Sequence, residues 1–426
     1  MLDIKIIREQ PDLVRSAIKA KRTDDILDDV LSFDGDRRAI ISRVELLKNK
    51  RNTVSEEIAR IKRKGEDADD VIAEMKIVSD EITALDTALR GIEENLNGLL
   101  DSIPNITHPD IPHGEDASAN KEVKRWVPRG DETLLEKKKG LDHLQVAEKY
   151  ELFDFKRGAK IAAAGFPLYT GRGAALERAL INFMLDEHSQ HNGYTEVLPP
   201  LFVNAESLRG TGNLPKFRDQ LYYMPEDELF AIPTAEVPVT NIYRDEILKA
   251  EDLPIKFCAF SACFRREAGS YGKDTRGFLR VHEFNKVELV KFSLPEDSYK
   301  EHEALTANAE SILEKLEIPY RRMLLCDGDT GFSSAKQYDL EVWAPVEGNW
   351  LEASSCSNFE AFQARRANIR FKRDPKSKPE FIHTLNGSGV ATSRLMVALL
   401  ENHQQADGSI AIPAVLHKYL TFTSIA

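Results

Sequence analysis

The chain has 426 residues, more than one ordinary hydrophobic core holds, so at least two domains are expected. Hydrophobic residues make up 42% and charged residues 30%, which is typical of a folded protein with a large solvated surface. The net charge of −12 argues against general nucleic-acid binding but leaves room for a local basic face.

Cysteine spacing and hydropathy exclude further classes of protein. None of the four cysteines forms a CxxC pair, which argues against zinc and favours free thiols in a reducing compartment. No run of about 18 apolar residues is present, so no membrane span is expected. The start, MLDIKIIREQPDLV, lacks the apolar core and cleavage site of a signal peptide. These features predict a cytosolic protein.

The N-terminal region contains the clearest periodicity. Ile4 and Ile6 predict a short strand, which is followed by helix. Hydrophobic residues then recur at steps of three, four or seven over 40–61 and again over 75–103, with a polar turn around Gly65 between them. This heptad pattern predicts two long helices that fold back on each other as an antiparallel coiled coil.

Charge is divided unevenly between these two helices. Residues 36–64 hold ten Lys/Arg against four Asp/Glu, a net of +6, whereas residues 66–103 hold two against eleven, a net of −9. Pairing across the helices explains such a division, and so does a protruding basic arm that grips a phosphate backbone; both readings stay open. The candidate RNA-binding residues are Arg51, Arg60, Lys62, Arg63 and Lys64.

The segment after the coiled coil lacks periodicity. It is rich in Pro, His and Gly, which is typical of a linker. The expected organisation is therefore a helical arm over residues 1–104, a linker over 105–132 and a body over 133–426.

The body begins with a helical pattern from Gly173 that stops at Asn192 and Gly193. A strand pattern follows, interrupted by Pro199 and Pro200. Because proline cannot donate to a strand ladder, this strand is expected at a sheet edge or an interface.

The stretch FRREAGSYGKDTRGFLRVHEFNKVE, residues 264–288, predicts two antiparallel strands joined by a Gly-rich turn. Arginine forks bind phosphate oxygens, an aromatic ring stacks on a base and a carboxylate holds an amine. A nucleotide beside an amino group fits such a surface, and a charged surface hairpin is the alternative. The side chains brought together are Arg265, Glu267, Arg280, Phe284 and Glu288.

Two shorter segments are weaker candidates. Thr234 and Glu236 lie between prolines, where they fit either a small polar ligand or a turn cap. Glu352, Ser354 and Ser355 offer hard oxygen ligands for Mg²⁺ shared with phosphates.

The last candidate is TLNGSGVATSRLMVALLENH, residues 384–403, which predicts a Gly-rich turn leading into a helix. Its glycines allow close backbone approach to a ligand, and Arg394 lies in the first turns. A helix start with a cation is an anion site.

Together these segments resemble the three motifs of class II aminoacyl-tRNA synthetases. Gly193 to Pro200 resembles motif 1, Arg265-Arg266-Glu267 with Arg280 and Phe284 resembles motif 2, and Gly387-Ser388-Gly389 with Arg394 resembles motif 3. Within that class the chain resembles the seryl-tRNA synthetase family, by its helical hairpin and by TGNLPKF at 211–217, TAE at 234–236, KVE at 286–288, EASS at 352–355 and TLNGSG at 384–389.

The resemblance implies an α+β protein: a mostly antiparallel sheet flanked by helices, preceded by the helical hairpin. It also implies a homodimer with Pro200 at the interface, ATP and Mg²⁺ as cosubstrate and cofactor, and L-serine and tRNA(Ser), with tRNA(Sec) as a further substrate. The variable arm of the tRNA would bind the hairpin, read more by shape and backbone than by base sequence.

Roles follow from the resemblance position by position. Arg265 would hold the α-phosphate and the serine carboxylate, and Arg394 the γ-phosphate. Glu267 would contact the adenine amino group, and Phe284 would stack on the ring. The other residues implied are Arg266, Val281, Ala353 and Ser354 for ATP, Glu352 and Ser355 for Mg²⁺ and ATP, and Thr234, Ala235, Glu236, Glu288 and Ser388 for serine.

Two positions depart from the family's usual pattern. Glu283 stands where Gln is usual, and Ala353 stands where Val is usual. Neither change removes an implied ligand, but Glu283 alters the charge expected near the nucleotide.

Two rival functions are compatible with the same fold. One is an enzyme that adenylates an amino acid for a carrier protein, against which the basic heptad arm argues. The other is a non-catalytic RNA-binding paralogue, against which the intact set Arg265, Glu267, Glu352, Ser355 and Arg394 argues.

Overall fold

The structure is a computed structural model that describes residues 1–267 and 277–426. The chain forms two compact units, residues 2–103 and residues 104–426 with Met1. Part of the Gly-rich turn predicted between Glu267 and Arg280 lies outside the described residues. No described helix is both long and apolar enough to cross a membrane.

The N-terminal unit is entirely helical. It comprises α1 (Ile4–Glu9), α2 (Pro11–Ala20), α3 (Leu27–Arg63) and α4 (Asp69–Leu100). The strand predicted at Ile4 and Ile6 is wrong, because these residues lie in α1. The Asp3 side chain accepts a hydrogen bond from the Lys5 amide and so caps this helix, a local effect that outweighs the alternation of apolar residues.

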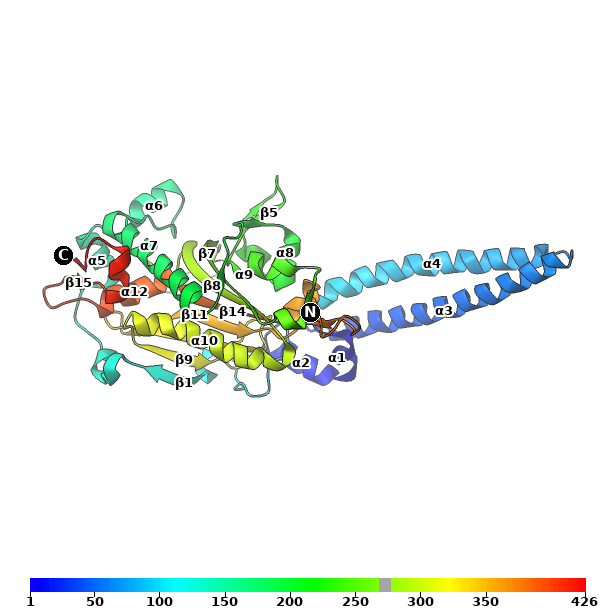
Figure 1. The fold of residues 1–426 in the computed structure, drawn as a ribbon, viewed down its shortest axis with the longest axis horizontal. Helices are drawn as coiled ribbons and strands as arrows, with labels where there is room; N and C mark the ends of the chain where they lie inside the picture. The colour runs from blue at the N-terminus through cyan, green and yellow to red at the C-terminus, as the bar shows by residue number, and fades with distance from the viewer. Residues whose placement is uncertain (268–276) are drawn as a thin grey trace. The chain divides into compact units, whose positions relative to one another are not determined.

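The predicted coiled coil is confirmed in α3 and α4 (Figure 1). Val44 and Leu47 of α3 pack against Met75, Val78 and Ile82 of α4 in one buried seam. At 1.5 Å per residue, the 37 residues of α3 span about 55 Å. The heptad spacing therefore predicted the antiparallel helix pair correctly.

The larger unit is built on an eight-stranded sheet, as the α+β class requires. Its neighbouring strands are antiparallel except β2 and β7, which are parallel. In spatial order the strands are β1 (Lys121–Trp126), β9 (Tyr320–Leu324), β10 (Lys336–Ala344), β11 (Asn349–Asn358), β14 (His383–Ala391), β8 (Glu283–Ser293), β7 (Ile255–Phe264) and β2 (Thr195–Glu196).

One edge strand of this sheet was predicted from the sequence and the other was not. The proline-flanked strand is β2, which lies at one edge as expected. The other edge is β1, which lies inside the segment predicted to be a linker. Its sequence, KEVKRW, has only Val123 and Trp126 as apolar residues, three positions apart, so it lacks the apolar alternation by which strands are recognised.

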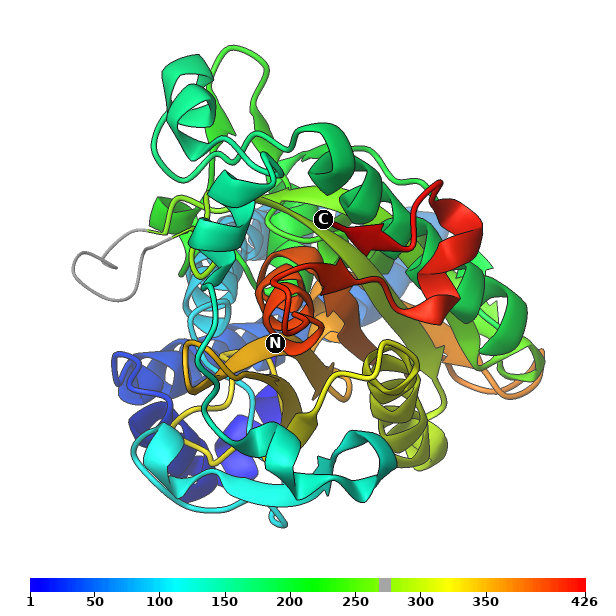
Figure 2. The ribbon, with the colours of Figure 1, turned by 90° about the vertical axis from the view of Figure 1, so that its left-hand side faces the viewer.

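Three helices cover the sheet through one shared hydrophobic core (Figures 1 and 2). They are α7 (Gly171–Asp186), α10 (Ser298–Lys315) and α12 (Thr392–Asn402). On β8, Val287 and Leu289 belong to this core, whereas Phe284 and Lys286 line a cavity. Side-chain alternation thus separates a packed face from an open one.

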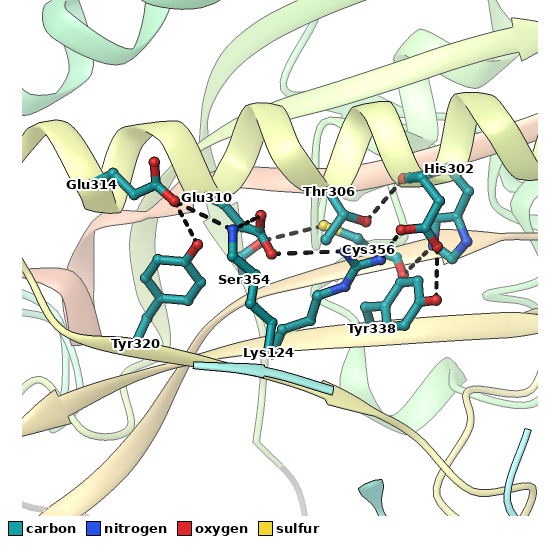
Figure 3. Close-up of polar contacts among 11 residues, drawn as sticks. Lys124, His302, Thr306, Glu310, Glu314, Tyr320, Tyr338, Ser354 and Cys356 are labelled. Carbon is teal, nitrogen blue, oxygen red and sulfur yellow. Dashed lines mark hydrogen bonds and ion pairs between the residues drawn. The ribbon is translucent and has the colours of Figure 1, made fainter. Parts of the chain in front are cut away.

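A partly buried polar layer lies between α10 and the strands, as Figure 3 shows. Lys124 of β1 pairs with Glu310 at 2.7 Å, and the Tyr338 hydroxyl donates to Glu303 at 2.7 Å. His302 bonds the Cys356 carbonyl of β11 at 2.9 Å, and burial lowers its pKa to about 4. A neutral His302 at pH 7 therefore fixes the back of the strand that carries Glu352 and Ser355.

The predicted Gly-rich turn at 384–391 is wrong, because these residues form strand β14. A Cβ on Gly387 would lie 2.4 Å from Leu305 and 2.8 Å from Cys356, and one on Gly389 would lie 2.6 Å from His188. These glycines serve close packing rather than a reversal of the chain.

The remaining elements surround this frame. The short helices are α5 (His143–Lys149), α6 (Phe155–Ile161), α8 (Ala205–Thr211), α9 (Glu236–Thr240) and α11 (Phe362–Arg366). The small sheets pair β3 (Phe202–Val203), β5 (Leu229–Ala231) and β4 (Tyr223–Met224); β13 (Glu380–Phe381), β12 (Arg370–Lys372) and β6 (Ile247–Lys249); and β15 (Ile410–Ala411) with β16 (Ser424–Ile425).

Candidate active site

The open face of the sheet carries a cavity of about 370 Å³. Its walls come from the ends of β7 and β8, from β11 and β14, and from the start of α12. Most of the nucleotide, metal and serine residues implied by the family resemblance line it, together with Arg280, namely Thr234, Glu236, Arg265, Glu267, Arg280, Val281, Phe284, Glu352, Ala353, Ser355, Ser388 and Arg394.

One part of the wall carries two arginines from the β7–β8 segment. Arg265 follows the last residue of β7, donates from Nε to the Pro233 carbonyl at 3.3 Å, and lies 5.1 Å over the Phe284 ring. Arg280 donates to the Glu267 carboxylate at 2.5 Å. The antiparallel pair predicted from sequence is confirmed, with Phe264 opposite Glu283.

Arg394 reaches the cavity from the first turn of α12. Its Nε donates to the Leu279 carbonyl at 3.3 Å, and Nη1 lies 2.9 Å from the Glu352 carbonyl and 3.3 Å from the Glu352 carboxylate. Three backbone and side-chain acceptors thus hold this guanidinium where an anion can meet it.

Oxygen donors of β10 and β11 gather beside Arg394. Asp339 and Ser355 are cross-strand partners, and the Gln337 amide bridges them, donating to Ser355 at 2.8 Å and to Asp339 at 3.2 Å. Burial and the nearby Glu352 raise the pKa of Asp339 well above its usual range. Two carboxylates and a hydroxyl are the hard ligands that Mg²⁺ takes, so this donor set fits that ion.

A buried carboxylate, Glu288, organises the polar groups on one part of the cavity wall. Glu288 is 1% exposed and forms an ion pair with Lys286. It also accepts from the Thr234 hydroxyl at 2.5 Å and from the Asn386 amide at 3.3 Å. Thr234, Lys286 and Asn386 all line the cavity, so Glu288 fixes the polar groups that a small ligand meets.

Glu236 is the second carboxylate in this part of the site. It accepts from the Gln363 amide at 2.7 Å. Burial, and then the charge of Glu288, raise the pKa of Glu236 to about 7. Thr234 accepts from the Glu236 amide at 3.2 Å, so the predicted turn cap and the predicted polar site are the same residues.

Four implied residues are absent from the described lining of the cavity, and the first is Glu288, which stands behind Thr234, Lys286 and Asn386. Arg266 lies 5.4 Å over the Tyr222 ring, and its amide donates to the Gln220 carbonyl at 2.9 Å. Ala235 is buried in a hydrophobic cluster. Ser354 donates to the Ser388 carbonyl at 2.6 Å and so supports the wall from behind.

Other wall residues were not assigned a role from the sequence. Lys286 lies in the KVE segment and Asn386 in the TLNGSG segment, so the family resemblance of these segments could have pointed to both residues. Asn213 and Phe217 belong to the TGNLPKF loop, which does reach the cavity. Phe332 comes from a segment with no sequence signal.

Glu283, the unusual residue before Phe284, is absent from the lining residues that the structure describes. It is half-buried on the opposite face of β8, and burial raises its pKa. The change from Gln therefore does not add a charge to the cavity wall.

The charges of the arm fall into two groups. Along the helices, Arg43 pairs with Glu81 at 2.8 Å and Lys50 with Glu74 at 2.6 Å. Near the turn, within residues 2–103, which are all described, no cross-helix ion pair holds the basic side chains Arg51, Arg60, Lys62, Arg63 and Lys64, and all but the half-buried Arg51 are exposed. Cross-helix pairing therefore accounts for part of the charge asymmetry, and RNA binding by the exposed basic side chains stays a prediction.

Comparison with known proteins gives matches over the whole chain. Residues 1–107 match the family described as the seryl-tRNA synthetase N-terminal domain, and residues 221–403 match the tRNA synthetase class II core domain (G, H, P, S and T).

Individual relatives extend this likeness. The serine–tRNA ligase of Chloroherpeton thalassium is 57% identical over 424 residues, which cover 99% of each chain, and that of Chlorobium phaeobacteroides is 56% identical over 432 residues, which cover 100% of each. The crystal structure of seryl-tRNA synthetase from Pyrococcus horikoshii complexed with ATP matches with a TM-score of 0.93 at 37% identity, over 100% of this chain and 99% of that chain.

Proposed function

The chain belongs to the seryl-tRNA synthetase family, whose activity is serine–tRNA ligation, and we propose that its cavity forms a seryl-adenylate from L-serine and ATP and passes the seryl group to tRNA(Ser). One observation carries this proposal: a single cavity combines arginines suited to phosphates with the carboxylate of Glu236, which is suited to an amine. The relative from Pyrococcus horikoshii, 37% identical, was solved with ATP.

In the first step the serine carboxylate attacks the α-phosphorus in line, and pyrophosphate leaves. Arg265 binds the α-phosphate and the serine carboxylate, which aligns the two reactants, and Arg394 binds the γ-phosphate. Glu267 accepts from the adenine amino group, Phe284 stacks on the ring and Val281 lines the same pocket. In the second step a ribose hydroxyl of the terminal adenosine attacks the seryl carbonyl, and AMP leaves.

Mg²⁺ is the metal that the oxygen donors favour. Glu352 and Ser355 would hold it, with Asp339 as a neighbouring carboxylate. When bound, the ion would neutralise charge on the phosphate oxygens. The contribution of the chain itself is to hold Ser355 through Gln337 and Glu352 beside Arg394.

Serine selection follows from the buried polar groups. Glu236 on the wall and Glu288 behind it supply negative charge for the ammonium group, and Thr234 and Ser388 complete the polar wall. Alanine would leave buried groups without a hydroxyl partner, and threonine would add a methyl group against this wall.

The exposed cations at the end of the hairpin would bind the variable arm of tRNA(Ser) through its phosphates. Family membership supports tRNA(Sec) as a second substrate and a homodimer that forms at the β2 edge near Pro200. Leu198 and Phe202 flank this proline with exposed apolar side chains, which suits an interface between two copies. A cytosolic location remains a prediction.

The test is ATP–pyrophosphate exchange with each of the twenty amino acids, followed by charging of tRNA(Ser) and tRNA(Sec). Exchange with serine and charging of tRNA(Ser) are expected. Exchange with another amino acid would assign the protein a different amino-acid specificity. Exchange without charging would favour the enzyme that loads a carrier protein. No exchange at all would favour the non-catalytic paralogue.

A further inference from the structure

A buried glutamate that no motif includes connects three elements around the active site. Glu177 lies in the middle of α7 and is 5% exposed. Its Oε1 accepts from the Asn285 amide at 2.9 Å and from the Thr392 hydroxyl at 2.5 Å. The same hydroxyl lies 3.0 Å from the Asn285 carbonyl, so the two partners also touch each other.

The partners of Glu177 are immediate neighbours of cavity residues. Asn285 lies on β8 between Phe284 and Lys286, and Thr392 begins α12 two residues before Arg394. Because adjacent strand residues share a backbone, a shift of Asn285 displaces Phe284 on the other face. A shift of Thr392 likewise moves the first turn of α12 and Arg394 with it.

The environment of Glu177 favours the protonated carboxyl more than water does. Burial raises its pKa to about 7. The titratable groups that face this region are Tyr169 and Glu283, and neither supplies a positive charge. In the part of the chain that the structure describes, Oε2 has no hydrogen-bond partner, so both contacts converge on Oε1.

We propose that Glu177 is a positioning residue for the nucleotide end of the cavity. Through Asn285 and Thr392 it clamps the strand that carries Phe284 and the helix that carries Arg394 onto α7. This inference rests on the roles proposed above for Phe284 and Arg394 in binding ATP. It predicts that loss of Glu177 weakens ATP binding and spares serine binding, since the serine residues are held by Glu288 and Gln363 instead.

The experiment compares Glu177→Ala, Glu177→Gln and a matched control, Glu310→Ala, in the full-length protein. Glu310 is 4% exposed, and Lys124 and Arg322, with which it forms ion pairs, belong to the polar layer of α10 rather than to the cavity wall. The readouts are the KM values for ATP and serine in pyrophosphate exchange, and the shift in Tm caused by a non-hydrolysable ATP analogue.

Glu177→Ala is expected to raise the ATP KM about tenfold, the equivalent of one lost buried hydrogen bond, while the serine KM stays within about twofold. The Tm shift caused by the analogue should shrink in parallel. Glu177→Gln should restore both readouts, because the amide oxygen accepts the same two bonds. Glu310→Ala should lower the Tm and leave the ATP KM unchanged.

Three results would overturn the inference. They are an unchanged ATP KM in Glu177→Ala, equal rises in Glu177→Ala and Glu310→Ala, and equal losses in Glu177→Ala and Glu177→Gln. If Glu177→Ala does not fold, Thr392→Val against Thr392→Ser decides, since only the valine removes the hydroxyl. The analogue shift needs no catalysis, so a failure of serine exchange in the unmodified protein would count against the proposed function alone.

Discussion

The cavity and the hairpin end handle charge in opposite ways. In and directly behind the cavity wall, Lys286, Arg394 and Glu288 are held by partners at fixed distances, and Lys286 and Glu288 are buried. At the hairpin end, Arg63 and Lys64 extend into solvent. A buried, partnered charge can place a reacting atom, because the protein has already desolvated and oriented it. An exposed charge acts through a field that salt screens, which suits a long, flexible polyanion.

The cavity side of this contrast is tested most strongly at Arg265. Arg265→Ala should lower serine-dependent pyrophosphate exchange about 10³-fold, because the phosphoryl charge loses a preorganised donor. Arg266→Ala is the matched control: the neighbouring arginine lies over Tyr222 and should change exchange less than about threefold. Similar losses in both variants would contradict the role of Arg265.

The hairpin side is tested by reversing Arg60, Arg63 and Lys64 to glutamate together. Charging of tRNA(Ser) should fall about 100-fold, and the salt dependence of tRNA affinity should flatten by about two units of log K against log salt. Pyrophosphate exchange by the same protein should not change, since it needs only the cavity. Unchanged tRNA affinity would remove the basic arm from recognition.

Glu236 sharpens the contrast through pH. Because the pKa of Glu236 is about 7, its carboxyl group in the ligand-free protein is mostly protonated below pH 7 and mostly ionised above it. The ammonium group of serine favours the ionised carboxylate, so the serine KM should fall about tenfold between pH 6 and pH 8 and level off near the upper end. Glu236→Gln should abolish this dependence; a sloping profile in that variant would assign the titration to another group.

The smallest effect is expected where the hairpin charges are paired. Lys50→Ala removes an exposed ion pair with Glu74 and should lower the free energy of unfolding by less than about 1 kcal/mol. Charging should stay within about twofold of the unmodified protein. A loss of charging as large as that of the triple reversal would mean that RNA contacts extend along the helices.

Local pattern was sufficient for some elements and not for others. The hairpin needed only its heptads, and the β7–β8 pair needed only alternation, because in both cases the interacting residues repeat at a fixed spacing. α1 was missed because one capping side chain outweighed a short alternation. The sequence does not predict β1, because a charged edge strand has no apolar period. It predicts a turn in place of β14, because the glycines of this strand are required by close packing against residues far away in the sequence.

The same division applies to the active site. Sequence motifs alone determined most of the residue types on the cavity wall and the existence of the arm, because those residues stand at short, ordered spacings. Only the tertiary structure decided that Arg266 and Ala235 lie off the wall, that Asn386 reaches Glu288, and that Glu177 of α7 contacts both β8 and α12. The physical reason is that hydrogen bonds between distant segments depend on strand order and helix packing, which no local spacing records.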